Sequence, residues 1–85
     1  MKLKSFCVNG RAVPNHFIIR DEYEEYFTSY DSVVVMKSAN GIITLGPDWD
    51  YSKTTSKYRS LYLGESTKET RRKLDAKIYR FDPQL

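Results

Sequence analysis

The sequence predicts an α+β domain, an antiparallel β-meander of four to six strands covered by two short C-terminal helices. Short apolar and β-branched runs separated by turn residues fill the first half, a pattern typical of strands joined by hairpins. After residue 52 the apolar residues recur at intervals of three and four, which is the period of a helix. A chain of 85 residues can bury one hydrophobic core, so we expect a single domain over residues 1–85.

The first strands are divided by glycine, asparagine and proline. Residues 3–8 form an apolar run, and Asn9-Gly10 is typical of a type I′ turn that returns the chain over residues 11–13. Pro14-Asn15 interrupts the pairing, because proline lacks a backbone donor. Residues 16–20 are predicted to form the next strand.

Three further segments complete the predicted meander. Residues 23–30 carry tyrosines and a phenylalanine that suit a half-buried pleated surface. Residues 33–36 are the most apolar run and are expected to form the central strand. Asn40-Gly41 predicts a second hairpin before residues 42–45, and Gly46-Pro47 ends the sheet.

The first helix is predicted to begin near Ser52. Tyr58, Leu61 and Tyr62 then share one helical face. Gly64 suits the left-handed residue that follows a helix.

The second helix is predicted from a capping box. Ser66 and Glu69 have its spacing, and the helix is expected to run to about Ala76. Its apolar stripe is poor, so we expect it to cover the sheet edge. Residues 78–81 are a candidate last strand before Pro83.

The charge is divided unevenly between the two halves. The net charge is +3, yet residues 1–50 hold five basic and seven acidic side chains, whereas residues 51–85 hold nine and four. A basic face of this kind favours a charged partner, although clustered charges also form ordinary solvated surfaces.

Catalytic and metal motifs are not recognised. One cysteine and one histidine cannot form a zinc site within one chain. We interpret Cys7 as a small buried residue and His16 as a local hydrogen-bonding residue. Asp48 and Asp50 could bind a cation around Trp49, but turn and capping roles are favoured. We therefore expect no enzyme activity, no metal and no cofactor.

An anion-binding surface is predicted on the two helices. Hydroxyls, cations and free amides converge at helix N-termini, which suits phosphate, although such hydroxyls also serve simply as caps. The predicted anion-binding residues are Lys53, Thr54, Thr55, Lys57, Arg59, Lys68, Arg71 and Arg72.

Aromatic residues predict a second, protein-binding surface. The chain has seven tyrosines, and Tyr and Trp provide large contact areas with a polar tip. The candidate interaction residues are Tyr23, Tyr26, Tyr30 and Trp49. Trp49, Tyr58 and Tyr62 are also expected at the contact between helix and sheet.

Three segments carry a resemblance. VNGRAVPNHFII (8–19), WDYSKTTSKYR (49–59) and LGESTKET (63–70) resemble segments of short uncharacterised proteins of tailed bacteriophages and related mobile elements. The resemblance implies a viral origin, a bacterial cytoplasm and action on a host or defence component. It implies no functional residues.

The sequence therefore predicts a small non-enzymatic phage-type binding protein. It would modulate or inhibit a host or defence protein by occupancy or sequestration, engaging an anionic ligand or partner through its basic helices. The alternatives are a nucleic-acid-binding accessory protein, a nucleotide-sequestering protein and a protein inhibitor acting through the tyrosine-rich hairpin. The single cysteine and the lack of a long apolar run predict a cytoplasmic protein without a membrane partner, and a homo-oligomer is possible.

Overall fold

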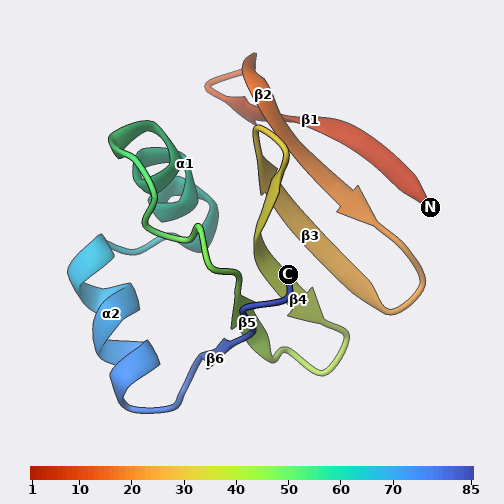
Figure 1. Ribbon diagram of the computed structural model, residues 1–85. Helices are drawn as coiled ribbons and strands as arrows, with labels where there is room; N and C mark the ends of the chain where they lie inside the picture. Colours follow the sequence, from red (N-terminus) through yellow and green to blue (C-terminus); the bar gives the residue numbers. More distant parts are fainter.

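A computed structural model describes residues 1–85 as one sheet with two helices packed against one side of it (Figure 1). Its elements are β1 (Lys2–Val8), β2 (Arg11–Arg20), β3 (Glu24–Ser29), β4 (Ser32–Ser38), β5 (Ile43–Leu45), α1 (Lys53–Leu63), α2 (Thr67–Asp75) and β6 (Arg80–Phe81). The strands lie side by side in chain order. The predicted α+β meander with C-terminal helices is confirmed.

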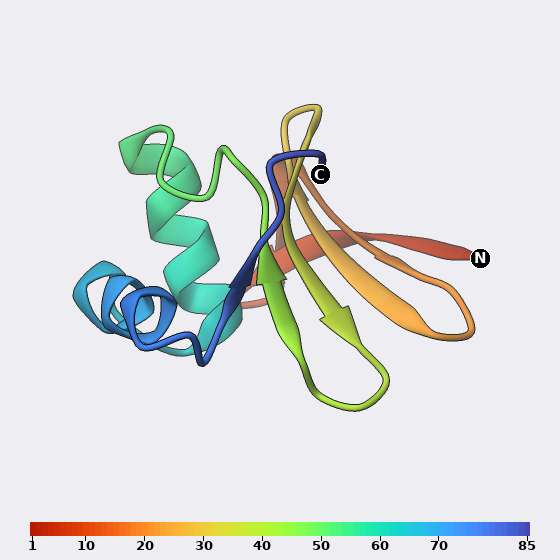
Figure 2. The same ribbon diagram turned by 60° about the horizontal axis from the view of Figure 1, so that its bottom comes forward.

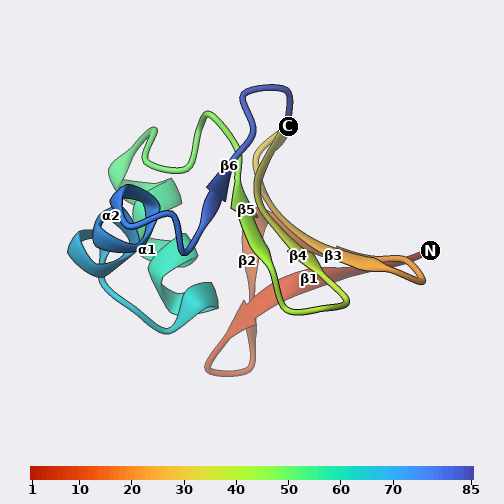
Figure 3. The ribbon, with the colours of Figure 1, turned by 90° about the horizontal axis from the view of Figure 1, so that it is seen from below.

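The last strand departs from the antiparallel pattern. β1 to β5 pair antiparallel, whereas β6 pairs with β5 in parallel. A parallel neighbour requires a long crossover, and here the two helices between β5 and β6 provide it. Figures 2 and 3 show both helices on the same side of the sheet.

β2 runs through the predicted interruption. It is one strand from Arg11 to Arg20, although Asn15 has φ of 64° and the register with β1 shifts between Ser5 and Cys7. The prediction of separate strands at 11–13 and 16–20 is therefore wrong. A strand accommodates proline at an irregularity, where no ladder donor is required.

The helix ends follow the predicted capping chemistry. The backbone N–H of Thr55 donates to Ser52 Oγ at 3.1 Å, and that of Glu69 donates to Ser66 Oγ at 3.1 Å. Gly64 ends α1 with φ of 72°, a conformation that glycine adopts without steric cost. The Glu69 carboxylate bonds Arg72 of the same helix instead of the Ser66 backbone N–H, so the reciprocal half of the predicted capping box is not formed.

The core lies between the sheet and α1. Its buried members are Ile18, Phe27, Val34, Val35, Leu45, Trp49 and Tyr79. Tyr62 of α1 stacks on Phe27, with ring centroids 4.9 Å apart, so the predicted contact of Tyr62 with the sheet is confirmed. Cys7 is exposed, because it lies on edge strand β1, and the expectation of a buried cysteine is wrong.

Neither helix has the length and apolar character needed to cross a membrane.

Candidate functional site

A row of charged side chains crosses the sheet beside the C-terminal end of α1. The strand register aligns Lys2 of β1, Arg20 of β2, Glu25 of β3 and Lys37 of β4. Lys4 lies in the next row, opposite the core residue Ile18. Residues paired across strands share a face of the sheet, so these side chains lie on the helix side.

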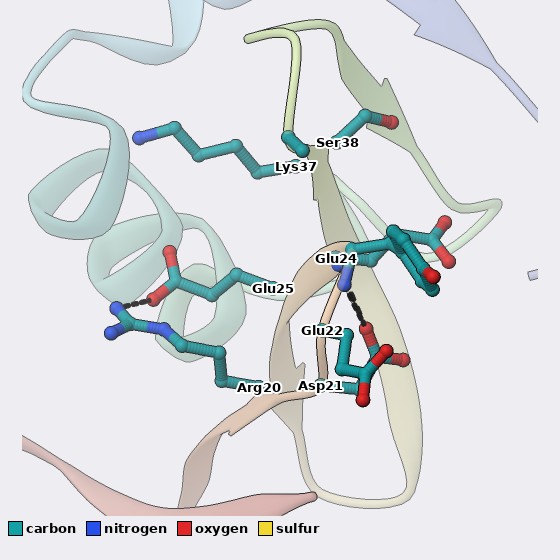
Figure 4. Close-up of a pocket in the computed structure, with 9 residues that line it drawn as sticks. Arg20, Asp21, Glu22, Glu24, Glu25, Lys37 and Ser38 are labelled. Carbon is teal, nitrogen blue, oxygen red and sulfur yellow. Dashed lines mark hydrogen bonds and ion pairs between the residues drawn. The ribbon is translucent and has the colours of Figure 1, made fainter.

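Three adjoining hollows follow this row and form what we call the sheet-end groove. One hollow, of about 360 Å³, is lined by Lys2, Leu3, Lys4, Ile18 and Arg20. The second hollow shares Lys4 and Ile18 with the first and is also lined by Glu25 and Tyr62. The third hollow shares Arg20 with the first and Glu25 with the second, and it is also lined by Lys37. Figure 4 shows the side chains of Arg20, Glu25 and Lys37 extending to the same side, away from those of Glu22 and Glu24.

Glu25 is the carboxylate at the centre of the groove. Arg20 Nη2 donates to its Oε1 at 2.5 Å, and the Tyr62 hydroxyl donates to its Oε2 at 2.8 Å. Burial alone would raise the pKa of Glu25, but the hydrogen bonds from Arg20 and Tyr62 and the charges of Arg20 and Lys37 lower it. Glu25 is therefore ionised at neutral pH, and the pKa of Tyr62 is raised by its burial and by this carboxylate.

The lysines of the groove have no carboxylate partner within the protein. Lys2, Lys4 and Lys37 are exposed and take part in none of the ion pairs of the chain. On the helix side of the sheet the groove thus presents four cations and one carboxylate, Glu25, which is already paired with Arg20. Asp21, Glu22 and Glu24 also line the third hollow, and the side chains of Glu22 and Glu24 extend away from those of Arg20, Glu25 and Lys37 (Figure 4).

Arg59 lies inside the protein, whereas the sequence predicted it on the anion-binding surface. Its side chain is 0% exposed, and it donates to the Trp49 carbonyl and to Thr67 Oγ1, both at 2.5 Å. Asp50 lies 3.7 Å from it. Burial lowers the pKa of Arg59, whereas Asp50 opposes that shift. The prediction that Arg59 faces an anionic ligand is wrong, because the guanidinium joins the α1 and α2 segments inside the protein.

The arginines of α2 are also paired. Arg71 Nη2 lies 2.9 Å from Asp50, and Arg72 Nη2 lies 2.5 Å from Glu69. The guanidinium carbons of Arg59 and Arg71 each lie 5.0 Å from the Trp49 ring centroid. Trp49 is buried, so it belongs to the helix–sheet contact and offers no surface to a partner.

The other predicted anion-binding residues fall into two groups. Thr55 is buried against Ser29 and cannot reach a surface ligand. Lys53, Thr54, Lys57 and Lys68 are exposed, and the three lysines have no carboxylate partner. We call these three lysines the helix lysines.

Glu65 organises the join between the helices and β6. Its carboxylate accepts hydrogen bonds from Thr70 at 2.6 Å, Tyr79 at 2.7 Å and Lys73 at 2.8 Å. Burial tends to raise the pKa of Glu65, but these three donors lower it. Lys73 is therefore another cation of the basic C-terminal third that is matched internally.

A family model described as a family of unknown function (DUF8033) matches residues 1–77. The chain belongs to this family. The matched span includes the whole sheet-end groove and both helices and ends before β6. No curated protein and no solved structure matches the chain.

The predicted tyrosine surface is not one surface. Tyr23 is 70% exposed and precedes β3, whereas Tyr30 is 53% exposed and follows it, so these two lie at opposite ends of the strand. Tyr26 is half-buried and pairs across strands with Ile19 and Met36. Tyr23 lines the third hollow of the groove.

A buried polar chain links β2, β3 and α1. His16 Nδ1–H donates a hydrogen bond to the Pro14 carbonyl at 2.8 Å, and the unprotonated Nε2 then accepts a hydrogen bond from Ser29 Oγ at 2.9 Å. Thr55 Oγ1 lies 2.9 Å from Ser29 Oγ. The local hydrogen-bonding role predicted for His16 is confirmed. The further hydrogen bonds with Ser29 and Thr55 give each of these buried polar side chains a partner.

Among all residues, no cluster of His, Cys, Asp or Glu is arranged to hold a metal ion.

Proposed function

We propose that this chain is a non-enzymatic binding protein that holds an acidic segment of a partner protein in the sheet-end groove and acts by occupancy. One observation carries the proposal. Lys2 and Lys4 of β1 and Lys37 of β4 line adjoining hollows of one groove and are exposed without a carboxylate partner. Unmatched charge of one sign on a concave surface attracts ligands of the opposite sign and speeds their encounter.

The central carboxylate favours a polypeptide over a nucleic acid. Glu25 is held ionised in the middle of the row, where it would repel a continuous run of phosphates. A nucleic-acid surface gains most of its affinity from phosphate contacts. A polypeptide can place acidic side chains beside the lysines and another group beside Glu25.

Apolar surface within the groove also favours a polypeptide ligand over a nucleic acid. Ile18 lines the first hollow with Lys2 and Lys4, and Phe6 and Tyr62 line the next one. Protein interfaces combine apolar and aromatic contacts with a charged rim. On the resemblance to short phage proteins, we further propose that the partner is a host or defence protein.

The test compares two variants with the same change in charge. Poly-L-glutamate serves as the probe, and a tag at the C-terminus keeps Lys2 free. In the groove variant Lys2, Lys4 and Lys37 are replaced by Gln, and in the control variant the helix lysines Lys53, Lys57 and Lys68 are replaced by Gln. All six side chains are exposed, so we expect both variants to fold, as circular dichroism can verify.

We expect the groove variant to bind poly-L-glutamate about tenfold more weakly, because three rim charge contacts are removed. The control should lose less than about threefold. Equal losses would show that net charge alone acts, and a larger loss in the control would place binding on the helices. Tighter binding of a single-stranded oligonucleotide, with a steep salt dependence, would overturn the choice of a polypeptide.

A further inference from the structure

We propose that the acidic segment binds as an extended β-strand added to the free edge of β1, with acidic side chains at alternate positions and apolar ones between them. This inference rests on the proposed function and specifies the conformation and sequence pattern of the part of the partner that meets Lys2 and Lys4. Lys37 lies on β4, separated from β1 by β2 and β3, and would meet a neighbouring part of the partner.

The free edge of β1 supplies the backbone groups. β1 is the first strand of the sheet and pairs only with β2, so alternate N–H and C=O groups on its other side have no strand partner. Residues 1–5 are all exposed, and Figures 1 and 2 show the N-terminal half of β1 extending free of both helices. An extended peptide can pair with such an edge through main-chain hydrogen bonds.

The two faces of this edge differ in chemistry. Lys2 and Lys4 face the groove, whereas Leu3 lies on the opposite face and is 65% exposed. The register places Leu3 at the end of an uncharged row with Ile19, Tyr26 and Met36. A strand added beside β1 would extend both rows, because directly opposed residues share a face. Acidic residues would then meet the lysines, and an apolar residue would cover Leu3.

Charge selects an acidic strand over a second copy of β1. Two β1 strands paired edge to edge would bring Lys2 and Lys4 of one copy near those of the other, and like charges on opposed positions destabilise pairing. Edge lysines commonly prevent such self-association. An acidic strand turns the same lysines into attractive partners.

The length of the added strand follows from the irregularity in β1. The register with β2 shifts between Ser5 and Cys7, and a shift of this kind bends the edge. The regular part of the edge therefore covers Lys2 to Ser5 and accommodates a segment of about four or five residues, with two acidic positions.

The test uses an eight-residue peptide that alternates valine and glutamate, with both ends blocked. Two further peptides carry N-methyl groups on one or the other alternate set of amides. Only one edge of the bound peptide can pair with β1, so we expect one methylated peptide to bind at least about tenfold more weakly and the other to resemble the parent. Amide hydrogen exchange in residues 2–5 should slow when the parent peptide is bound.

Other outcomes separate this inference from the proposed function. Strand addition is overturned if both methylated peptides bind as tightly as the parent peptide. It is also overturned if the parent peptide does not bind while poly-L-glutamate binding still depends on Lys2, Lys4 and Lys37. In both cases the groove remains the binding surface. If neither the peptide nor poly-L-glutamate binds, both proposals fail. Leu3→Ser provides a check on the opposite face, because it should weaken the alternating peptide and leave poly-L-glutamate binding little changed.

Discussion

The helix pair and the sheet-end groove both gather cations, but they use them in different ways. In the helix pair, Arg59, Arg71, Arg72 and Lys73 each face a carboxylate of the same chain, and only the helix lysines are free. In the groove only Arg20 faces a carboxylate, and Lys2, Lys4 and Lys37 are free. A dense run of charged residues in the sequence therefore need not provide free charge at every position in the fold.

The difference has a physical cause. Residues close in sequence on a helix become neighbours at spacings of three and four, so charges of opposite sign pair locally, as Arg72 does with Glu69. The groove lysines come from β1 and β4, and their cross-strand neighbours belong to other parts of the chain. Glu25 is the one carboxylate in their row, and Arg20 is already bonded to it.

The largest predicted effect tests whether Arg59 is structural. Arg59→Ala removes a fully buried side chain and leaves the Trp49 carbonyl and Thr67 without their donor. We expect the free energy of unfolding to fall by about 3–5 kcal/mol. Urea denaturation measures it, with Lys57→Ala on the exposed face of α1 as the control. A loss as small as that of the control would show that the helix-pair cations are not built into the fold.

The second prediction concerns acid stability and Glu65. Its lowered pKa stabilises the fold at every pH above the pKa of the unfolded chain, and this contribution is lost as the pH falls through the folded-state pKa. Glu65→Gln should lower the free energy of unfolding by about 1–3 kcal/mol at pH 7, because Lys73 and Tyr79 lose a charged acceptor.

The pH profile of this variant separates charge from packing. As the pH falls through the folded-state pKa, the wild-type carboxyl becomes protonated, so the difference in stability between wild type and Glu65→Gln should narrow in urea denaturation. A difference that stays constant over the whole acid range would assign the effect to side-chain shape instead of the ionised carboxylate.

The sequence was sufficient for the local structure and insufficient for the groove. Asn9-Gly10, Ser52, Gly64 and Ser66 each act within a few residues, and all four occupy the predicted turns and caps. The groove requires the register of four strands, and that register contains shifts on β1 and β3 that no local pattern reveals.

One signal in the sequence indicates that Arg59 is buried, and another points the opposite way. It follows Thr55 by four positions and precedes Tyr62 by three, which places all three on one face of α1. Its charge favoured a surface position, because buried arginine is uncommon. The partners that make its burial possible, Trp49 and Thr67, come from segments on either side of α1, and their approach depends on the tertiary packing.

The smallest predicted effect compares the two regions directly, through the same substitution in each. Glu25→Gln removes the central carboxylate of the groove and releases Arg20, whereas Glu69→Gln on α2 releases Arg72. If the groove binds acidic ligands, Glu25→Gln should tighten poly-L-glutamate binding by about two- to fivefold, as expected for one rim charge, and Glu69→Gln should change it little. Both variants raise the net charge equally, so fluorescence titration at fixed salt isolates the position of the charge. Tightening by Glu69→Gln alone would transfer the binding surface to the helix pair, because only a ligand lying against α2 would sense the released Arg72.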